Sequence, residues 1–127
     1  MSYSLRCRVC EEITVPVPLD TCRRCDGPTD VAYDWEWVRE NVSHATIAAG
    51  PRSLWRYRAL LPGAARLDFG AGWTPLIRAH RLSRLLDVDL YLKLESANPT
   101  LSFKDRLSTI AAQVALDHGV TTLCCSS

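Results

Sequence analysis

Hydrophobic and polar positions recur with different periods along the chain, and these periods predict the strands and the helix of its C-terminal part. Residues 89–95 carry leucine at every second position, which predicts a strand with one apolar face. From Ser102 onward apolar residues recur every three or four positions, which predicts a helix that Gly119 ends. Residues 121–125 form a short apolar run and predict a buried strand. Strand, helix and strand in this order predict a βαβ unit of a parallel sheet.

The first two thirds of the chain contain shorter patterns. Tyr33, Trp35 and Trp37 alternate with acidic residues, which predicts a short strand. Residues 54–61 predict one or two helical turns ended by a Pro-Gly pair, and residues 81–86 predict the end of another helix. The aromatic side chains of this part are expected to pack rather than to carry chemistry.

The expected loop at residues 96–101 leads into a helix start that contains a lysine. Ser102 and Asp105 have the Ser-x-x-acid spacing of a capping box. Lys104 falls in the first turn, where the helix dipole disfavours a cation. Only a neutral amine attacks a carbonyl group, so a lysine at this position suits imine chemistry. A surface lysine with no chemical role is the alternative.

Composition narrows the function classes. The 127 residues are 47% hydrophobic and 23% charged, which is typical of a globular protein. A net charge of +1 gives no reason to expect a nucleic-acid partner. No apolar run approaches the roughly 20 residues of a membrane span, and the N-terminus lacks a signal-peptide pattern, so a cytoplasmic protein is expected. Lys93 and Lys104 are its two lysines.

Four cysteines near the N-terminus form two Cys-x-x-Cys pairs, Cys7 with Cys10 and Cys22 with Cys25. Four thiolates at this spacing predict a tetrahedral Zn²⁺ site. Because the protein would supply all four ligands, the zinc is expected to be structural. Two disulfides or four free thiols are alternatives, although nothing marks the chain as secreted.

Two expectations accompany this site. Gly27 follows the second pair, where we expect the turn to need a permissive backbone. Residues 13–18 are β-prone and contain two prolines, which predicts a short edge hairpin.

Three segments together resemble the threonine synthase family: residues 72–76 (GWTPL), 93–95 (KLE) and 98–106 (NPTLSFKDR). These are pyridoxal-phosphate (PLP) enzymes of fold type II, the group of tryptophan synthase β and threonine dehydratase. The cysteine pairs, residues 33–35 and residues 54–58 are also similar to zinc-bearing members of the family. The family has glycine where this chain has Leu101, and a leucine is expected to impose ordinary backbone angles there.

The resemblance implies a role for each matching residue. Lys104 would carry PLP on its amine and act as the catalytic residue, and Phe103 would lie against the pyridine ring. The remaining cofactor-binding residues would be Asn98, Ser102, Asp105 and Arg106. The implied reaction converts O-phospho-L-homoserine and water into L-threonine and phosphate, so the partner would be a phosphorylated amino acid.

The expected fold class is α/β: an N-terminal zinc ribbon (1–30), a connecting segment (31–68) and the start of a PLP-dependent domain (69–127), a parallel sheet cut short. The resemblance places the glycine-rich loop for the cofactor phosphate after Ser127, so these residues alone are expected to be inactive. A missing C-terminal part or a second chain would supply the rest. The alternatives are another PLP lyase of this fold, such as cysteate synthase, and a non-catalytic zinc-ribbon module that binds nucleic acid.

Overall fold

The computed structural model describes residues 3–16 and 21–124. Its N-terminal part is a small antiparallel sheet in which β1 lies between two partners. The three strands are β1 (Ser4–Cys7), β2 (Ile13–Thr14) and β3 (Thr29–Ala32). The β2 strand confirms the edge strand expected within residues 13–18, whose last two residues lie outside the described ranges.

Three short helical elements follow: α1 (Trp35–Asn41), α2 (His44–Ala48) and the 3-10 helix η1 (Leu54–Leu60). The helix α1 shows that the strand expected at residues 33–37 is wrong. Asp34 caps this helix, because its Oδ1 accepts the N–H groups of Glu36 at 3.1 Å and Trp37 at 3.0 Å. The element η1 confirms the helical turns expected at residues 54–61.

The apolar core lies around η1. Leu54, Trp55 and Ala71 are buried together, and Leu61, Ala65 and Ile110 pack against them. The backbone N–H of Leu54 donates to the carbonyl of Ala71 at 2.7 Å, so the connecting segment is tied to the residues that precede β4. Tyr33 links the N-terminal part to η1, because its hydroxyl donates to the carbonyl of Leu60 at 2.8 Å.

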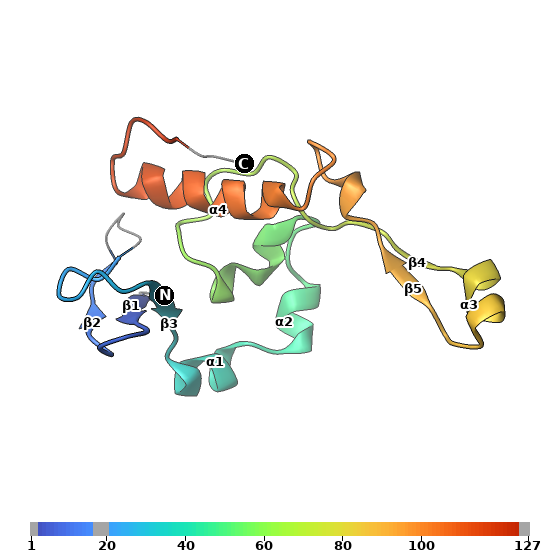
Figure 1. Ribbon diagram of the computed structural model, residues 1–127, viewed down its shortest axis with the longest axis horizontal. Coiled ribbons are helices and arrows are strands. Elements are labelled where there is room, and N and C mark those ends of the chain that lie inside the picture. Colours follow the sequence, from blue (N-terminus) through green and yellow to red (C-terminus); the bar gives the residue numbers. More distant parts are fainter. Residues whose placement is uncertain (1–2, 17–20, 125–127) are drawn as a thin grey trace.

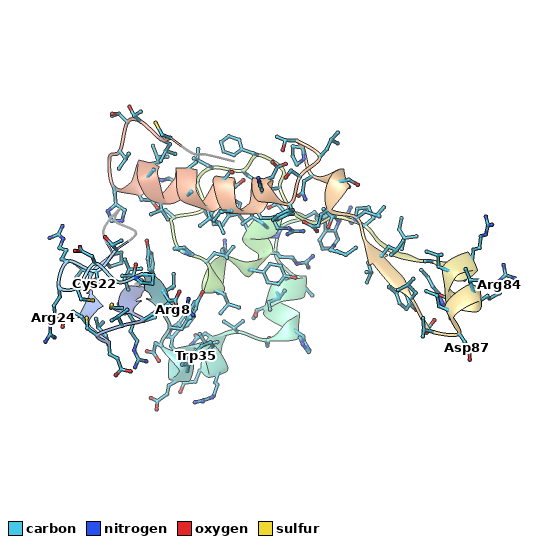
Figure 2. All side chains as sticks on the ribbon, in the orientation of Figure 1. Arg8, Cys22, Arg24, Trp35, Arg84 and Asp87 are labelled. Carbon is cyan, nitrogen blue, oxygen red and sulfur yellow. The ribbon has the colours of Figure 1, made fainter. Side chains whose placement is uncertain are left out.

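A slender arm projects from the end of the molecule opposite the N-terminal sheet (Figure 1). It consists of β4 (Leu76–Arg78), α3 (His80–Leu86) and β5 (Tyr91–Lys93). Figure 2 shows Arg84 and Asp87 near its tip, far from Cys22 and Arg24. The helix α3 and the strand β5 confirm two expected elements, in shorter form for the strand. All residues of β4 and β5 are exposed.

The parallel sheet expected from the sequence is wrong for the described residues. β5 pairs antiparallel with β4, and residues 120–124 are irregular. Residues 121–124 are also exposed, whereas a buried strand was expected there; residue 125 lies outside the described part. A parallel strand needs neighbouring strands and cover on both faces, and the described residues provide neither at this position.

The longest helix, α4 (Lys104–Asp117), crosses the top of the molecule in the view of Figure 1. It confirms the helix expected after Ser102, and Gly119 follows its end with a φ of 69°. Thr109, Gln113 and Ala115 are its buried residues. None of the helices in residues 3–16 and 21–124 is long and apolar enough to cross a membrane.

Candidate functional site

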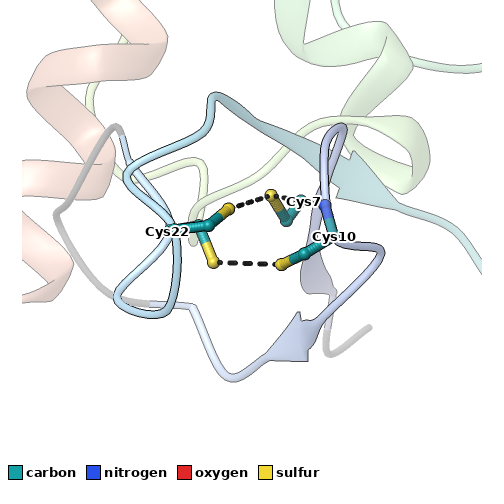
Figure 3. A group of neighbouring side chains, drawn as sticks. Cys7, Cys10 and Cys22 are labelled. Carbon is teal, nitrogen blue, oxygen red and sulfur yellow. Dashed lines mark hydrogen bonds between the residues drawn. The ribbon is translucent and has the colours of Figure 1, made fainter.

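The four cysteines of the two pairs come together at one point of the N-terminal part (Figure 3). Their sulfur atoms all lie within 4.8 Å of one another. The Sγ atoms of Cys7 and Cys25 are 3.5 Å apart, and those of Cys10 and Cys22 are 3.7 Å apart. Zn–S bonds of about 2.3 Å place tetrahedral sulfurs about 3.8 Å apart, so this donor set fits a zinc ion.

The two pairs are built in the same way. In each, a backbone N–H two residues further on donates to the first sulfur, from Val9 to Cys7 at 3.3 Å and from Arg24 to Cys22 at 3.4 Å. The residue after each pair, Glu11 or Asp26, has a left-handed backbone with a φ of 60° or 56°. These two turns present all four sulfurs toward a common centre.

Gly27 corrects one expectation about this site. Its backbone does not lie in the left-handed region; that conformation is taken by Asp26. A glycine is needed at position 27 for space, because a Cβ atom there would lie 2.7 Å from Cγ2 of Val9 and 3.1 Å from Sγ of Cys7. A larger residue would therefore push into the cysteine cluster.

The thiols differ in acidity. Backbone N–H groups of Cys10 and Val9 lower the pKa of Cys7 to about 6, since they stabilise the thiolate. For Cys25 the N–H of Gly27 lowers the pKa, but the neighbouring sulfurs of Cys10 and Cys7 outweigh it and raise the pKa to about 12. Four thiolates at this spacing repel one another, and a divalent cation between them would offset the repulsion.

A second group of polar side chains lies where the arm meets α4. Its hub is Glu95, in the 3-10 turn η2 (Glu95–Ala97) that follows β5. Arg106 of α4 makes a two-point contact with this carboxylate: Nε donates to Oε2 and Nη2 donates to Oε1, each at 2.8 Å. The buried hydroxyl of Thr74 donates to Oε1 at 2.8 Å. The backbone carbonyl of Thr74 accepts a hydrogen bond from Nζ of Lys93.

Asn98 is almost completely buried and joins the segment at Gly72 to the turn η2. Its Oδ1 accepts the N–H of Gly72 at 2.9 Å, and its Nδ2 donates to the carbonyl of Glu95 at 2.8 Å and to Oε2 of the same residue at 3.1 Å. Gly72 has a φ of 90°, and a Cβ atom there would lie 2.7 Å from the backbone nitrogen of Leu54. Asn98 therefore fixes the loop from inside.

The ionisation of this network follows from its contacts. The hydrogen bonds from Arg106, with a smaller effect of the Thr74 hydroxyl, lower the pKa of Glu95 to about 2. The same carboxylate raises the pKa of Arg106 above its ordinary value. Both groups are thus charged at neutral pH, and their side chains are 30% and 33% exposed. The pair is less exposed to solvent than a surface ion pair, and it has a two-point contact. It therefore joins η2 to α4 more strongly than a surface ion pair would.

Lys104 is the first residue of α4 and is exposed, beside the exposed ring of Phe103. The capping box expected from Ser102 and Asp105 does not form. The hydroxyl of Ser102 accepts only the N–H of Lys104, at 3.2 Å. Asp105 instead binds Thr100, accepting its N–H at 2.8 Å and its hydroxyl proton, because the loop curls back over the first turn of the helix.

Leu101 corrects a further expectation. It keeps a left-handed backbone with a φ of 61°, the conformation that a glycine adopts without strain. The leucine side chain points to solvent and is 75% exposed. The turn is held by the bond from the N–H of Leu101 to the carbonyl of Asn98 at 2.8 Å. The fold of the loop therefore overrides the preference of this residue.

The structure brings the six expected cofactor-binding residues into one loop and helix start, residues 98–106. It also adds two residues to which the sequence assigned no role, Glu95 and Thr74. Both belong to segments already singled out in the sequence, KLE and GWTPL. Their spacing alone gave no sign that Arg106 would join them.

Comparisons with known proteins show what this part of the chain is similar to. Residues 67–127 match the family model of the pyridoxal-phosphate dependent enzymes. This part of the chain is therefore similar to the enzymes of that family.

Curated relatives make the resemblance more specific. The chain is 35% identical to the threonine synthase of Methanosarcina acetivorans over 98% of its length, covering 31% of that relative. It is 36% identical to the threonine synthase of Methanocaldococcus jannaschii over 84% of its length, covering 27% of that relative. The similarity to threonine synthases predicted from the sequence is confirmed.

The chain thus spans about a third of the length of these relatives. A shorter match joins it to the threonine synthase of Mycobacterium bovis, at 48% identity over 44% of the chain and 16% of the relative. No solved structure matches the chain significantly.

Proposed function

We propose that the chain is part of a PLP-dependent enzyme that converts O-phospho-L-homoserine and water into L-threonine and phosphate. The similarity to threonine synthases over nearly the whole chain supports this reaction. The observation that carries the proposal is the position of Lys104: it is an exposed residue at the start of α4, directly after a loop that the buried side chain of Asn98 holds.

The residues around Lys104 fit the cofactor chemically. A primary amine is adjacent in sequence to an exposed aromatic ring at Phe103, and the Ser102 hydroxyl lies two residues before it. When bound, PLP supplies an electron sink for bond cleavage at the amino acid. Lys104 would hold the cofactor and transfer protons, and Phe103 would lie against its ring. Asn98, Ser102, Asp105 and Arg106 would keep the loop in shape.

The four cysteines would hold a structural zinc ion, and residues 1–30 would form a zinc ribbon. Four sulfur ligands leave no position for a reacting water, so the ion would stabilise the N-terminal part and take no part in the reaction. Residues 31–68 would connect this ribbon to the PLP-dependent part that begins at residue 69. We expect the protein in the cytoplasm, where thiols stay reduced.

The test of the lysine is chemical trapping. The purified chain is incubated with PLP and reduced with borohydride, and the pyridoxyl group is located by peptide mapping. We expect the label on Lys104 and its loss in Lys104→Arg. The matched control is Lys93→Arg, which changes the other lysine and should keep the label. Label on Lys93 alone, or on neither lysine, would contradict the assignment.

The test of the reaction is phosphate release from O-phospho-L-homoserine. These 127 residues contain no glycine-rich segment to hold the cofactor phosphate, so we expect no appreciable turnover from them alone. Activity is expected when the remaining length seen in the relatives is present, on the same or a second chain. Turnover with another amino-acid substrate but not with O-phospho-L-homoserine would keep the enzyme class and reject the substrate.

A further inference from the structure

Glu95 connects the part of the chain before Lys104 to the helix that carries it. Its carboxylate accepts hydrogen bonds from Thr74, Asn98 and Arg106. Two of these contacts come from one guanidinium group, and a fork of this kind fixes direction as well as distance. The end of β5 and the first turn of α4 are therefore joined in a single orientation.

Lys104 lies two residues before Arg106, in the same first turn of α4. An α-helix has about 3.6 residues per turn, so residues two positions apart project about 200° apart around the axis. Arg106 is held on the side of Glu95 and is only about one third exposed, whereas Lys104 projects from the other side and is exposed. If Arg106 were released, the first turn of α4 could rotate and Lys104 would rotate with it.

A second restraint acts on the residue between them. Asp105 holds the backbone of Thr100, which lies at the other end of the loop. That contact limits how far the loop can open, but it does not reach the arm. Of the contacts described here, the Glu95–Arg106 pair is the direct link between this helix turn and the end of β5.

We propose that Glu95 is a positioning residue for Lys104: by holding Arg106, it fixes the direction in which the Lys104 amine projects. The consequence for cofactor attachment rests on the proposed function, whereas the geometric effect does not. Glu95 itself does not touch the reacting amine.

The informative variant is Glu95→Gln, which keeps the size of the side chain and one acceptor oxygen. It removes the charge and turns an N–H₂ group toward the donors of Arg106, so the two-point contact is lost. Glu12→Gln is the matched control, because it breaks another carboxylate–arginine pair, with Arg24 at 3.2 Å, in the N-terminal part. Both variants are first checked for a cooperative unfolding transition above the working temperature.

The first measurement needs no cofactor. Reductive methylation with ¹³C-formaldehyde places a methyl label on the amines, and Lys104→Arg identifies the Lys104 signal by NMR. In Glu95→Gln we expect this signal to move toward its position in the urea-unfolded chain, while Glu12→Gln leaves it in place. A Lys104 signal that is unchanged in folded Glu95→Gln would overturn the proposal.

The second measurement uses PLP and borohydride, with the N-terminal amine as internal reference. We expect the ratio of label on Lys104 to label on that amine to fall about tenfold in Glu95→Gln, because a misdirected amine reacts poorly. An unchanged ratio would overturn the positioning role and leave the proposed function intact. If the unaltered chain takes no label on Lys104, the proposed function fails, and the NMR signal alone decides the role of Glu95.

Discussion

Gln113 of α4 holds the backbone of Arg66 from inside the protein. Its Oε1 accepts the N–H of Arg66 at 2.7 Å and also the N–H of Leu67 at 2.7 Å. Its Nε2 donates to Oδ1 of Asp117 at 2.8 Å, and Gln113 is completely buried. One side chain of α4 thus satisfies two consecutive backbone groups of the connecting segment, which has no regular structure there.

Gln113→Met tests this contact. Methionine has a similar length but cannot accept the two N–H groups, and each buried donor left without a partner costs about 1–3 kcal/mol. We expect the free energy of unfolding, measured with urea, to fall by about 2–4 kcal/mol. Leu107→Met, at an exposed position of the same helix, is the control and should change it little. A small loss in Gln113→Met would show that water replaces the lost acceptor.

The substitution Leu101→Gly tests whether the left-handed backbone at position 101 is strained. A left-handed backbone costs a leucine about 1–2 kcal/mol, and glycine avoids this cost but gains entropy when unfolded. We expect Leu101→Gly to leave the free energy of unfolding unchanged or to raise it by up to about 1 kcal/mol.

The control for Leu101→Gly is another exposed leucine. Leu107 is 71% exposed and lies inside α4, where glycine is unfavourable. Leu107→Gly should therefore lower the free energy of unfolding by about 1 kcal/mol. Equal losses in the two glycine variants would mean that position 101 carries no strain.

Acid should weaken the link between β5 and α4. Hydrogen bonds from Arg106 hold the pKa of Glu95 at about 2, below the ordinary value of 4.5. A lowered pKa in the folded state gives stability that is fully present above pH 4.5 and is lost as the pH falls toward 2. The difference in unfolding free energy between the unaltered chain and Glu95→Gln should therefore shrink over this interval.

The measurement is urea unfolding of both proteins between pH 5 and 2, with a chelator present so that metal release does not contribute. The comparison cancels the titration of Asp117, whose pKa is also lowered: burial opposes the shift, but bonds from Arg66 and Ala64 prevail. A difference that stays constant over the interval would show that Glu95 gains nothing from its charge.

The cysteine cluster is tested by metal content. We expect one zinc ion per chain, lost in Cys22→Ser, since a hydroxyl is a poor ligand beside three thiolates. Removal of the metal should lower the stability of the N-terminal part, because metal affinity is coupled to folding. Cys124→Ser is the control, since Cys124 is exposed and lies outside the cluster. Zinc retained in Cys22→Ser, or absent from the unaltered chain, would contradict the site.

The sequence by itself determined the features that depend on local spacing. Two Cys-x-x-Cys pairs specify their own turns, so the gathering of four sulfurs was predictable from chain positions alone. The helix after Ser102 was equally clear, because its apolar period extends over several turns. Residues 98–106 are contiguous in the sequence, so grouping them needed no knowledge of distant contacts.

Tertiary structure decided the features that depend on distant partners. The start of α1 was missed for a local reason, because the Asp34 cap outweighs the alternation at residues 33–37. The pairing of β5 with β4 depends on which strand lies next to it, and the roles of Glu95 and Gln113 depend on partners 11 and 46 to 47 residues away. Leu101 is held left-handed by its loop. A sequence pattern records local preference, whereas the strand pairing and the contacts of Glu95 and Gln113 form only when separate segments have folded against one another.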